Sequence, residues 1–338
     1  MSTRTRARHH EGNLRSVWQL CAAILAAALL LPNTDVHAQA YPTRAIRLIV
    51  PYTPGGSSDI LARSIGQRLS ESWGQPVVVE NKPGANGNLG ADLVAKARPD
   101  GHTLLLTDIG ALCISPAAFP GLPFEPARDF AAVIMLSYSP HILAVHPGLA
   151  VNTVQELIGL ATARPGTLNF ATAGLGSAPH LAGIEFGLRS GVQWTYIAYK
   201  GGSQAIADVA AGHADVLFNG MLATYPFVKG GRLKAIAVSS PLRVAAAPHL
   251  PTVAESGLPG FETGSWQGVL APAGTPPQIV AKLNVEIARI LATADMRERL
   301  AAQGTEVRAG TPESLARFMH SELSRWAKVV KQSGVKFD

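Results

Sequence analysis

Residues 46–59 read IRLIVPYTPGGSSD, a short apolar run that leads through a loop of small residues into two serines. The apolar run predicts a buried strand, and Ser57 with Ser58 predicts a helix start. A helix start offers unpaired N–H groups and the positive end of a dipole, which together suit an anion. The stretch therefore predicts a strand, a loop and a helix, with the loop as a candidate anion site.

A second stretch has the same order. Residues 168–180 read LNFATAGLGSAPH, with Ser177 as the helix cap and Pro179 in the first turn. Two such helix starts suggest two lobes that close on one small carboxylate. For either loop alone, an ordinary strand-to-helix turn is an equally good interpretation, because such turns are common.

Runs with β character alternate with helical patterns from residue 46 onward. Most runs are short and apolar on both faces, which is typical of buried parallel strands, so the alternation predicts an α/β fold with mostly parallel sheets. A break at Ser139-Pro140 separates two of the runs, and residues 277–334 are helical throughout. The predicted strands are 46–50, 76–80, 103–107, 133–136, 142–146, 169–173, 194–199, 214–218, 233–239 and 268–271.

Two extended segments, 133–147 and 263–274, are candidate crossings between lobes. Crossings at both places would build lobe 1 from residues 41–140 and 265–338, and lobe 2 from residues 141–264. Two lobes joined by two strands form a hinge, and ligands commonly bind between such domains. We therefore expect a two-lobed protein with its site between the lobes.

Residues 1–40 have the order of a secretory signal peptide. Arginines precede the apolar run 17–31, which is shorter than the roughly 20 residues that span a bilayer. Small residues at Ala38 and Ala40 predict cleavage before Tyr41, with cleavage after Ala38 as the alternative. We expect this segment to be removed and the protein to reach the periplasm.

The charge and cysteine content exclude other classes. The formal net charge is +6, without a basic stripe with interleaved aromatics, so we expect no nucleic-acid partner. Loss of the leader removes Cys21 and leaves Cys113 alone, which excludes an intrachain disulfide. The apolar neighbours of Cys113 favour a buried thiol, although a reactive one stays open.

Motifs for catalysis and cofactors are missing. There is no P-loop and no Gly-x-Ser-x-Gly elbow, and residues 174–179 place Pro179 where a dinucleotide fingerprint needs its third glycine. The histidines are scattered, without the spacing of a zinc site. We expect no enzymatic activity, no cofactor and no metal. An exported α/β hydrolase remains an alternative, because a Ser–His–Asp arrangement can assemble in space from any sequence order.

Six short motifs, spread over nearly all of the chain beyond residue 40, resemble one known family. They are 49–59 (IVPYTPGGSSD), 74–87 (GQPVVVENKPGANG), 99–105 (PDGHTLL), 199–202 (YKGG), 251–257 (PTVAESG) and 271–276 (APAGTP). Together they resemble the periplasmic solute-binding proteins of bacterial tripartite tricarboxylate transporters, the Bug family. The resemblance implies a two-lobed type II periplasmic binding fold. It also implies an exported receptor, which we expect to be a monomer, that delivers a small carboxylic acid to two membrane subunits.

The resemblance also implies that backbone groups and bridging waters of two loops hold one carboxylate. These loops correspond to residues 52–57 and 173–177, with His180. Strand ends add further candidates. Asn86 is predicted as a turn residue, and Trp266 as a core residue, with a hinge aromatic as the alternative. The predicted ligand-binding residues are Tyr52, Thr53, Gly55, Gly56, Ser57, Thr107, Asp108, Ala173, Gly176, Ser177, Tyr199 and Asn219.

One departure from the family pattern bears on the ligand. Asn219-Gly220 stands where the family usually has Asp-Asn. A neutral amide pairs with an ammonium group less strongly than a carboxylate does. We therefore hypothesise an acid without an amino group, such as a dicarboxylate, a hydroxy acid or an aromatic acid. A receptor that passes its ligand state to a membrane sensor would share the same fold and site, so transport and signalling both stay open.

Overall fold

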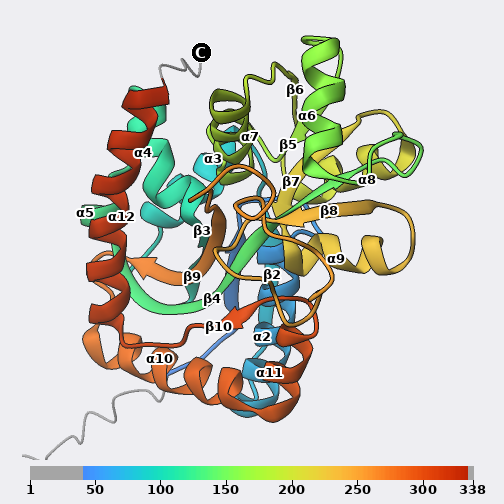
Figure 1. The fold of residues 1–338 in the computed structure, drawn as a ribbon. Helices are drawn as coiled ribbons and strands as arrows, with labels where there is room; N and C mark the ends of the chain where they lie inside the picture. Colours follow the sequence, from blue (N-terminus) through green and yellow to red (C-terminus); the bar gives the residue numbers. More distant parts are fainter. Residues whose placement is uncertain (1–40, 334–338) are drawn as a thin grey trace, which may run out of the picture. The chain divides into compact units, whose positions relative to one another are not determined.

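Strands and helices alternate through most of the chain, as the sequence predicts (Figure 1). The computed structural model describes residues 41–333, and the predicted signal peptide lies outside them. The strands are β1 (Ile46–Val50), β2 (Val77–Asn81), β3 (Thr103–Asp108), β4 (Phe130–Val145), β5 (Asn169–Thr172), β6 (Thr195–Ala198), β7 (Val216–Gly220), β8 (Lys234–Val238), β9 (Gly264–Pro272) and β10 (Glu306–Val307). The helices are α2 (Ser57–Trp73), η1 (Ala85–Gly87), α3 (Asn88–Ala95), η2 (Gly110–Ile114), α4 (Ser115–Ala118), α5 (Pro126–Asp129), α6 (Val154–Ala163), α7 (Ala178–Ser190), α8 (Gly202–Ala211), α9 (Met221–Lys229), α10 (Pro277–Ala292), α11 (Ala294–Ala301) and α12 (Pro312–Ser333).

The strands of this region form one mixed sheet in the order β2-β1-β3-β9-β4-β7-β5-β6, with β8 and β10 also paired to β4. Parallel pairing is confined to the outer strands, β2-β1-β3 and β7-β5-β6. The strands β9 and β4 pair antiparallel with each other and with their neighbours. The expectation of mostly parallel sheets therefore holds at the two ends and is wrong in the middle, because the two long connecting strands run in opposite directions.

Strand β4 is continuous, whereas the sequence predicts two runs broken at Ser139-Pro140. Its partner changes at that point: Pro140 is the last residue opposite β9, and His141 is the first opposite β7. A proline lacks the N–H that a ladder requires, and here it stands where one ladder gives way to the next. We call β1, β2, β3, β9, β10 and β4 up to Pro140 the first half-sheet, and β5 to β8 with β4 from His141 the second.

Buried apolar clusters pack on both half-sheets, and the cluster of the first also takes in Ala178, Leu181 and Ile184 of α7. On the first, Ile49, Leu105 and Trp266 pack with the C-terminal helix α12. On the second, Phe170, Phe218 and their neighbours pack beneath α6 and α7. The core assignment of Trp266 is confirmed, since only 1% of its side chain is exposed. Cys113 is buried as well, and burial raises the pKa of its thiol well above the ordinary value.

The C-terminal part is helical as predicted, apart from the short strand β10, which pairs with Ser137 and Tyr138 of β4. None of the helices in residues 41–333 is long and apolar enough to cross a membrane.

Candidate functional site

One cavity of about 50 Å³ collects residues from both half-sheets. That volume gives room for about four water molecules, so the cavity is small. The loops after β1 and β2 and the end of β3 contribute one side, and the ends of β5 and β7 contribute the other. Gly56 and Ser177, one from each predicted loop, line it together. The lining residues are Tyr52, Gly56, Ser57, Ser58, Asn86, Asp108, His141, Ala173, Ser177, Pro179, Gly202, Asn219, Gly220, Ser265 and Gln267.

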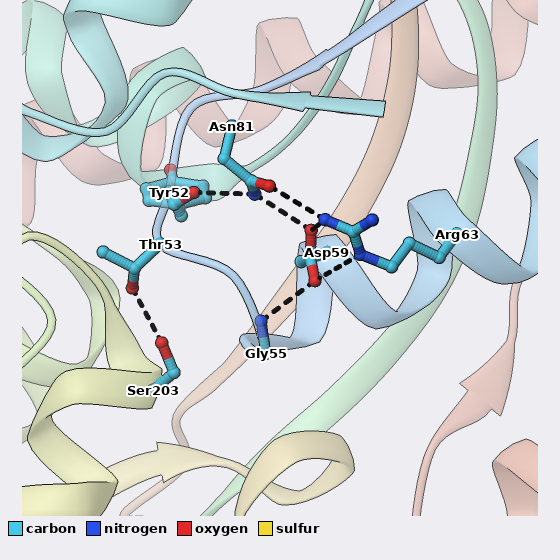
Figure 2. A network of polar contacts seen from close by, with 7 residues as sticks. All are labelled: Tyr52, Thr53, Gly55, Asp59, Arg63, Asn81 and Ser203. Atoms are coloured by element: carbon cyan, nitrogen blue, oxygen red, sulfur yellow. Dashed lines mark hydrogen bonds and ion pairs between the residues drawn. The ribbon is translucent and has the colours of Figure 1, made fainter. Parts of the chain in front are cut away.

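The loop before α2 is fixed by the buried carboxylate of Asp59 (Figure 2). Its Oδ2 atom accepts from the Gly55 N–H at 2.9 Å and from the Arg63 guanidinium at 2.9 Å. Its Oδ1 atom accepts from the Asn81 amide at 2.9 Å. Gly55 takes a φ of +83°, which an L side chain rarely adopts. Because no side chain caps α2 at Gly56, its first N–H groups face the cavity unblocked.

The loop before α7 is held by bonds within itself. The Ser177 hydroxyl donates to the Gly174 carbonyl at 2.7 Å and accepts from the His180 N–H at 3.3 Å. The Gly176 N–H donates to His180 Nδ1 at 3.1 Å. Ser177 therefore caps its own helix and lines the cavity at the same time.

Two more helices begin at the cavity. Gly202 is the first residue of α8, and Gly220 is the residue before α9. The N-cap residue of each helix is a glycine and gives no side-chain cap, although the first N–H of α9, that of Met221, donates to the Ser139 hydroxyl at 3.0 Å. Four helix starts therefore open on one cavity, and three of them carry glycine where a capping side chain would stand. Their partial positive charges add, which favours a negatively charged occupant.

The lining residues include no lysine and no arginine. Burial raises the pKa of Asp108 to about 6, against smaller opposing effects of hydrogen bonds from Tyr52 and Gly110. Burial also lowers the pKa of His141 to about 3, so its imidazole is neutral. In residues 41–333 no group of His, Cys, Asp and Glu side chains is arranged to hold a metal ion. The cavity therefore offers an anion the dipoles of helix starts, without a lysine or arginine and with Asp108 as the one carboxylate of its lining.

Two buried polar atoms of the lining residues have no hydrogen-bond partner, Asn86 Oδ1 and His141 Nε2. The other ring nitrogen of His141 lies 3.1 Å from the Thr263 hydroxyl. Asn86 and its neighbour Ala85 both have positive φ angles, 53° and 46°. Strained backbone of this kind gathers at ligand sites, and buried atoms without partners are expensive. Both observations indicate that the cavity is built to be occupied.

The structure brings most of the predicted site residues together. Those that line the cavity are Tyr52, Gly56, Ser57, Asp108, Ala173, Ser177 and Asn219. The others lie just behind it, and each already has a partner. Thr53 bonds to Ser203, Gly55 donates to Asp59, Thr107 contacts the Tyr52 hydroxyl, Gly176 contacts Asn86 and His180, and Tyr199 donates to Asp208.

Several lining residues are absent from the sequence prediction: Ser58, Asn86, His141, Pro179, Gly202, Gly220, Ser265 and Gln267. A usable signal existed for two of them, since Gly202 and Gly220 directly precede helical patterns in the manner of Gly56. Asn86 is more than a turn residue, because its amide donates to the Gly176 carbonyl at 3.1 Å and so contacts the opposite loop.

The fold is a mixed sheet in two halves with helices packed on it, and residues of both halves line one cavity to which helix starts point. This arrangement is that of a solute-binding protein. The chain belongs to the tripartite tricarboxylate transporter family receptors, whose family model TctC matches residues 61–335. The protein BugT of Bordetella pertussis is 39% identical over 302 residues, covering 89% of this chain and 93% of BugT. The family resemblance seen in the motifs is thereby confirmed.

Solved structures agree with the assignment. A protein of R. palustris with adipate is 37% identical, with a TM-score of 0.85 over 88% of this chain and 99% of that one. MatC from Rhodopseudomonas palustris with bound malate is 34% identical, with a TM-score of 0.82 over 86% of this chain and all of that one (100%). The fold is therefore that of the periplasmic binding proteins of this family.

Proposed function

We propose that this protein closes on a small carboxylic acid outside the cytoplasm and delivers it to the membrane subunits of a tripartite tricarboxylate transporter. The observation that carries the proposal is the cavity on which the starts of α2, α7, α8 and α9 converge without a lysine or arginine. Backbone dipoles at this density suit a carboxylate. The relatives solved with adipate and with malate bind ligands of this class.

Closure takes place between two lobes, residues 41–140 with 265–338 and residues 141–264. In support, β4 changes partners between Pro140 and His141, and β9 begins at Gly264 opposite Pro140. Side chains also meet across the proposed boundary. Thr53 Oγ1 lies 2.7 Å from Ser203 Oγ, and the Asn86 amide donates to the Gly176 carbonyl. These contacts belong to a closed state.

The ligand's carboxylate is held by the N–H groups around Gly56 and Ser57, opposite the loop of Ser177, whose own N–H donates to the Gly174 carbonyl at 3.2 Å. Asn219 faces the same cavity as a neutral amide and donates to the Thr224 hydroxyl at 3.0 Å. Position 219 carries no carboxylate that could neutralise an ammonium group, which leaves Asp108 as the one carboxylate of the lining, and the ligand class that we propose is an acid without an amino group.

Two alternatives differ in what they require. A hydrolase requires a base on the Ser177 hydroxyl, but that hydroxyl donates to the Gly174 carbonyl, and His180 Nδ1 accepts from the Gly176 N–H. This geometry favours binding over catalysis. Export through residues 1–40 places the receptor in the periplasm, and action as a monomer fits both transport and signalling. Its gene's neighbours would distinguish these two.

A thermal-shift screen with calorimetric follow-up tests the proposed function. The purified protein is exposed to adipate, malate, other small mono- and dicarboxylates, aspartate and glutamate, with the neutral diamide of each dicarboxylate as the control. A ligand that binds only the folded state raises the melting temperature. We expect acids without an amino group to do so and the diamides to have no effect. No shift with any acid contradicts the function, and tight binding of aspartate or glutamate alone contradicts the ligand class.

A further inference from the structure

Asp108 is the one carboxylate among the residues that line the cavity. Its Oδ1 atom is fully used, because it accepts from the Tyr52 hydroxyl at 2.5 Å and from the Gly110 N–H at 2.8 Å. Within residues 41–333, its Oδ2 atom has no hydrogen-bond partner. A carboxyl oxygen thus remains available to the occupant of a cavity that otherwise favours anions.

Among the described residues that line the cavity, no lysine or arginine stands beside this carboxylate. The titratable groups around it are Tyr52 from the loop after β1, Cys113 from η2 and His141 from β4. Burial raises the pKa of Tyr52 and of Cys113, and lowers that of His141, so all three are neutral at pH 7. The pKa of Asp108 itself is about 6 before any ligand is present. A second negative charge beside it would raise that pKa further.

The two donors that contact Asp108, the Tyr52 hydroxyl and the Gly110 N–H, are already used by its Oδ1 atom. A Cβ atom on Gly110 would lie 3.0 Å from Asp108 Oδ1 and 3.2 Å from Asn86 Oδ1, so both oxygens lie against the same residue. Asn86 Oδ1 is buried and has no donor. An additional carboxylate oxygen from a ligand would add a further acceptor to this corner. A proton on the carboxyl group is the donor that would complete it.

We propose that Asp108 binds the ligand as a carboxylic acid, donating from Oδ2 to a ligand carboxylate, so that binding takes up one proton from solvent. The inference rests on the proposed function and narrows the ligand to a dicarboxylic acid. One carboxylate lies at the helix starts and the other shares the proton of Asp108. No other bond forms or breaks. Asp108 is thereby a specificity-determining residue, which rejects a ligand end that is neutral and offers no acceptor.

Calorimetry with adipate and with malate tests this inference. Titrations at pH 7.5 in buffers of different ionisation enthalpy give the number of protons bound per ligand, and we expect about one. Because Asp108 must be protonated to bind, affinity falls about tenfold per pH unit above pH ~6. The variant Asp108→Asn keeps a donor at this position without a titrating group. We expect it to bind with no proton uptake and with little dependence on pH.

Asp92→Asn is the matched control, since Asp92 lies on α3 and pairs with Lys96 away from the cavity. It should behave as the unmodified protein does. Binding of adipate or malate without proton uptake overturns the inference and leaves the proposed function intact. The same holds if the protein binds only acids that are not dicarboxylic acids. Proton uptake that persists in Asp108→Asn overturns it as well. The buffer series on the unmodified protein decides the question even where Asp108→Asn fails to fold.

Discussion

Thr53 Oγ1 lies 2.7 Å from Ser203 Oγ, although 150 residues separate the two in the sequence (Figure 2). Thr53 belongs to the loop before α2, and Ser203 lies in the first turn of α8. The bond therefore joins two of the helix starts that face the cavity. A Cβ atom on Gly201 would lie 2.3 Å from Thr53 Oγ1, so the approach depends on that glycine.

Removal of this bond should weaken ligand binding. Thr53→Val keeps the shape of the side chain and removes the hydroxyl, as Ser203→Ala does on the other side. A hydrogen bond of this kind contributes about 1 kcal/mol, so each variant should lose affinity by about fivefold. A double-mutant cycle by calorimetry should show that the double variant loses no more than either single one. Additive losses would mean that the two hydroxyls act independently.

A methyl group at Gly202 should obstruct the cavity. Its Cβ atom would lie 2.5 Å from Asn219 Oδ1. We expect Gly202→Ala to displace the buried Asn219 side chain, and so to lower the melting temperature of the free protein and to reduce affinity for the ligand by more than tenfold. Gly159→Ala is the control, because a Cβ atom there meets nothing within 4 Å in helix α6. Equal affinities for the two variants would show that α8 does not border the ligand.

Acid should weaken the loop before α2 through Asp59. Hydrogen bonds from Arg63, Gly55 and Asn81 outweigh burial and hold its pKa below the ordinary value of 3.8. The charged form is thus favoured in the folded state, and its stabilising contribution is complete above pH 3.8. It is lost as the pH falls through the lower folded-state pKa.

The measurement is the free energy of unfolding between pH 7 and pH 3. Asp59→Ala should lower it by about 2 kcal/mol at pH 7, since the Gly55 N–H and the Asn81 amide lose their acceptor. The gap between the variant and the unmodified protein should narrow below pH 3.8. A constant gap across the pH range would show that Asp59 does not titrate in this window. Asp92→Ala, which removes an exposed pair, should change stability by less than 1 kcal/mol.

A carboxylate at position 219 should change ligand preference. Asn219→Asp places a negative charge in the cavity, which repels a dicarboxylate and attracts an ammonium group. We expect affinity for adipate or malate to fall at least tenfold and weak binding of aspartate to appear. Calorimetry with adipate or malate and with aspartate measures the change in affinity for each ligand class. If the affinities for both ligand classes stay the same, Asn219 does not determine ligand specificity.

Local sequence patterns predict the elements well and the long strands poorly. The turn into α2 is readable because strand, small residues and serines follow one another within 46–59. The continuity of β4 is not readable, because Pro140 normally ends a strand and is tolerated here only where the ladder changes partner. That change depends on β7 and β9, which are distant in sequence.

The site shows the same division. Gly56, Ser57 and Ser177 lie in the cavity because a helix start is a local feature. His141 is missed because its place depends on where β4 passes between the half-sheets. Local pattern also cannot separate residues that face the cavity from those that support it, such as Tyr199, whose hydroxyl donates to Asp208 at 2.6 Å.

The helix starts at Gly56, Gly202 and Gly220 present main-chain amides, which every amino acid possesses. Binding of the ligand's negative charge by these amides therefore depends little on which side chains surround the cavity. After gene duplication, the copies of such a receptor can change the side chains around the cavity and thereby their ligand specificity. The backbone contacts to the carboxylate are kept throughout.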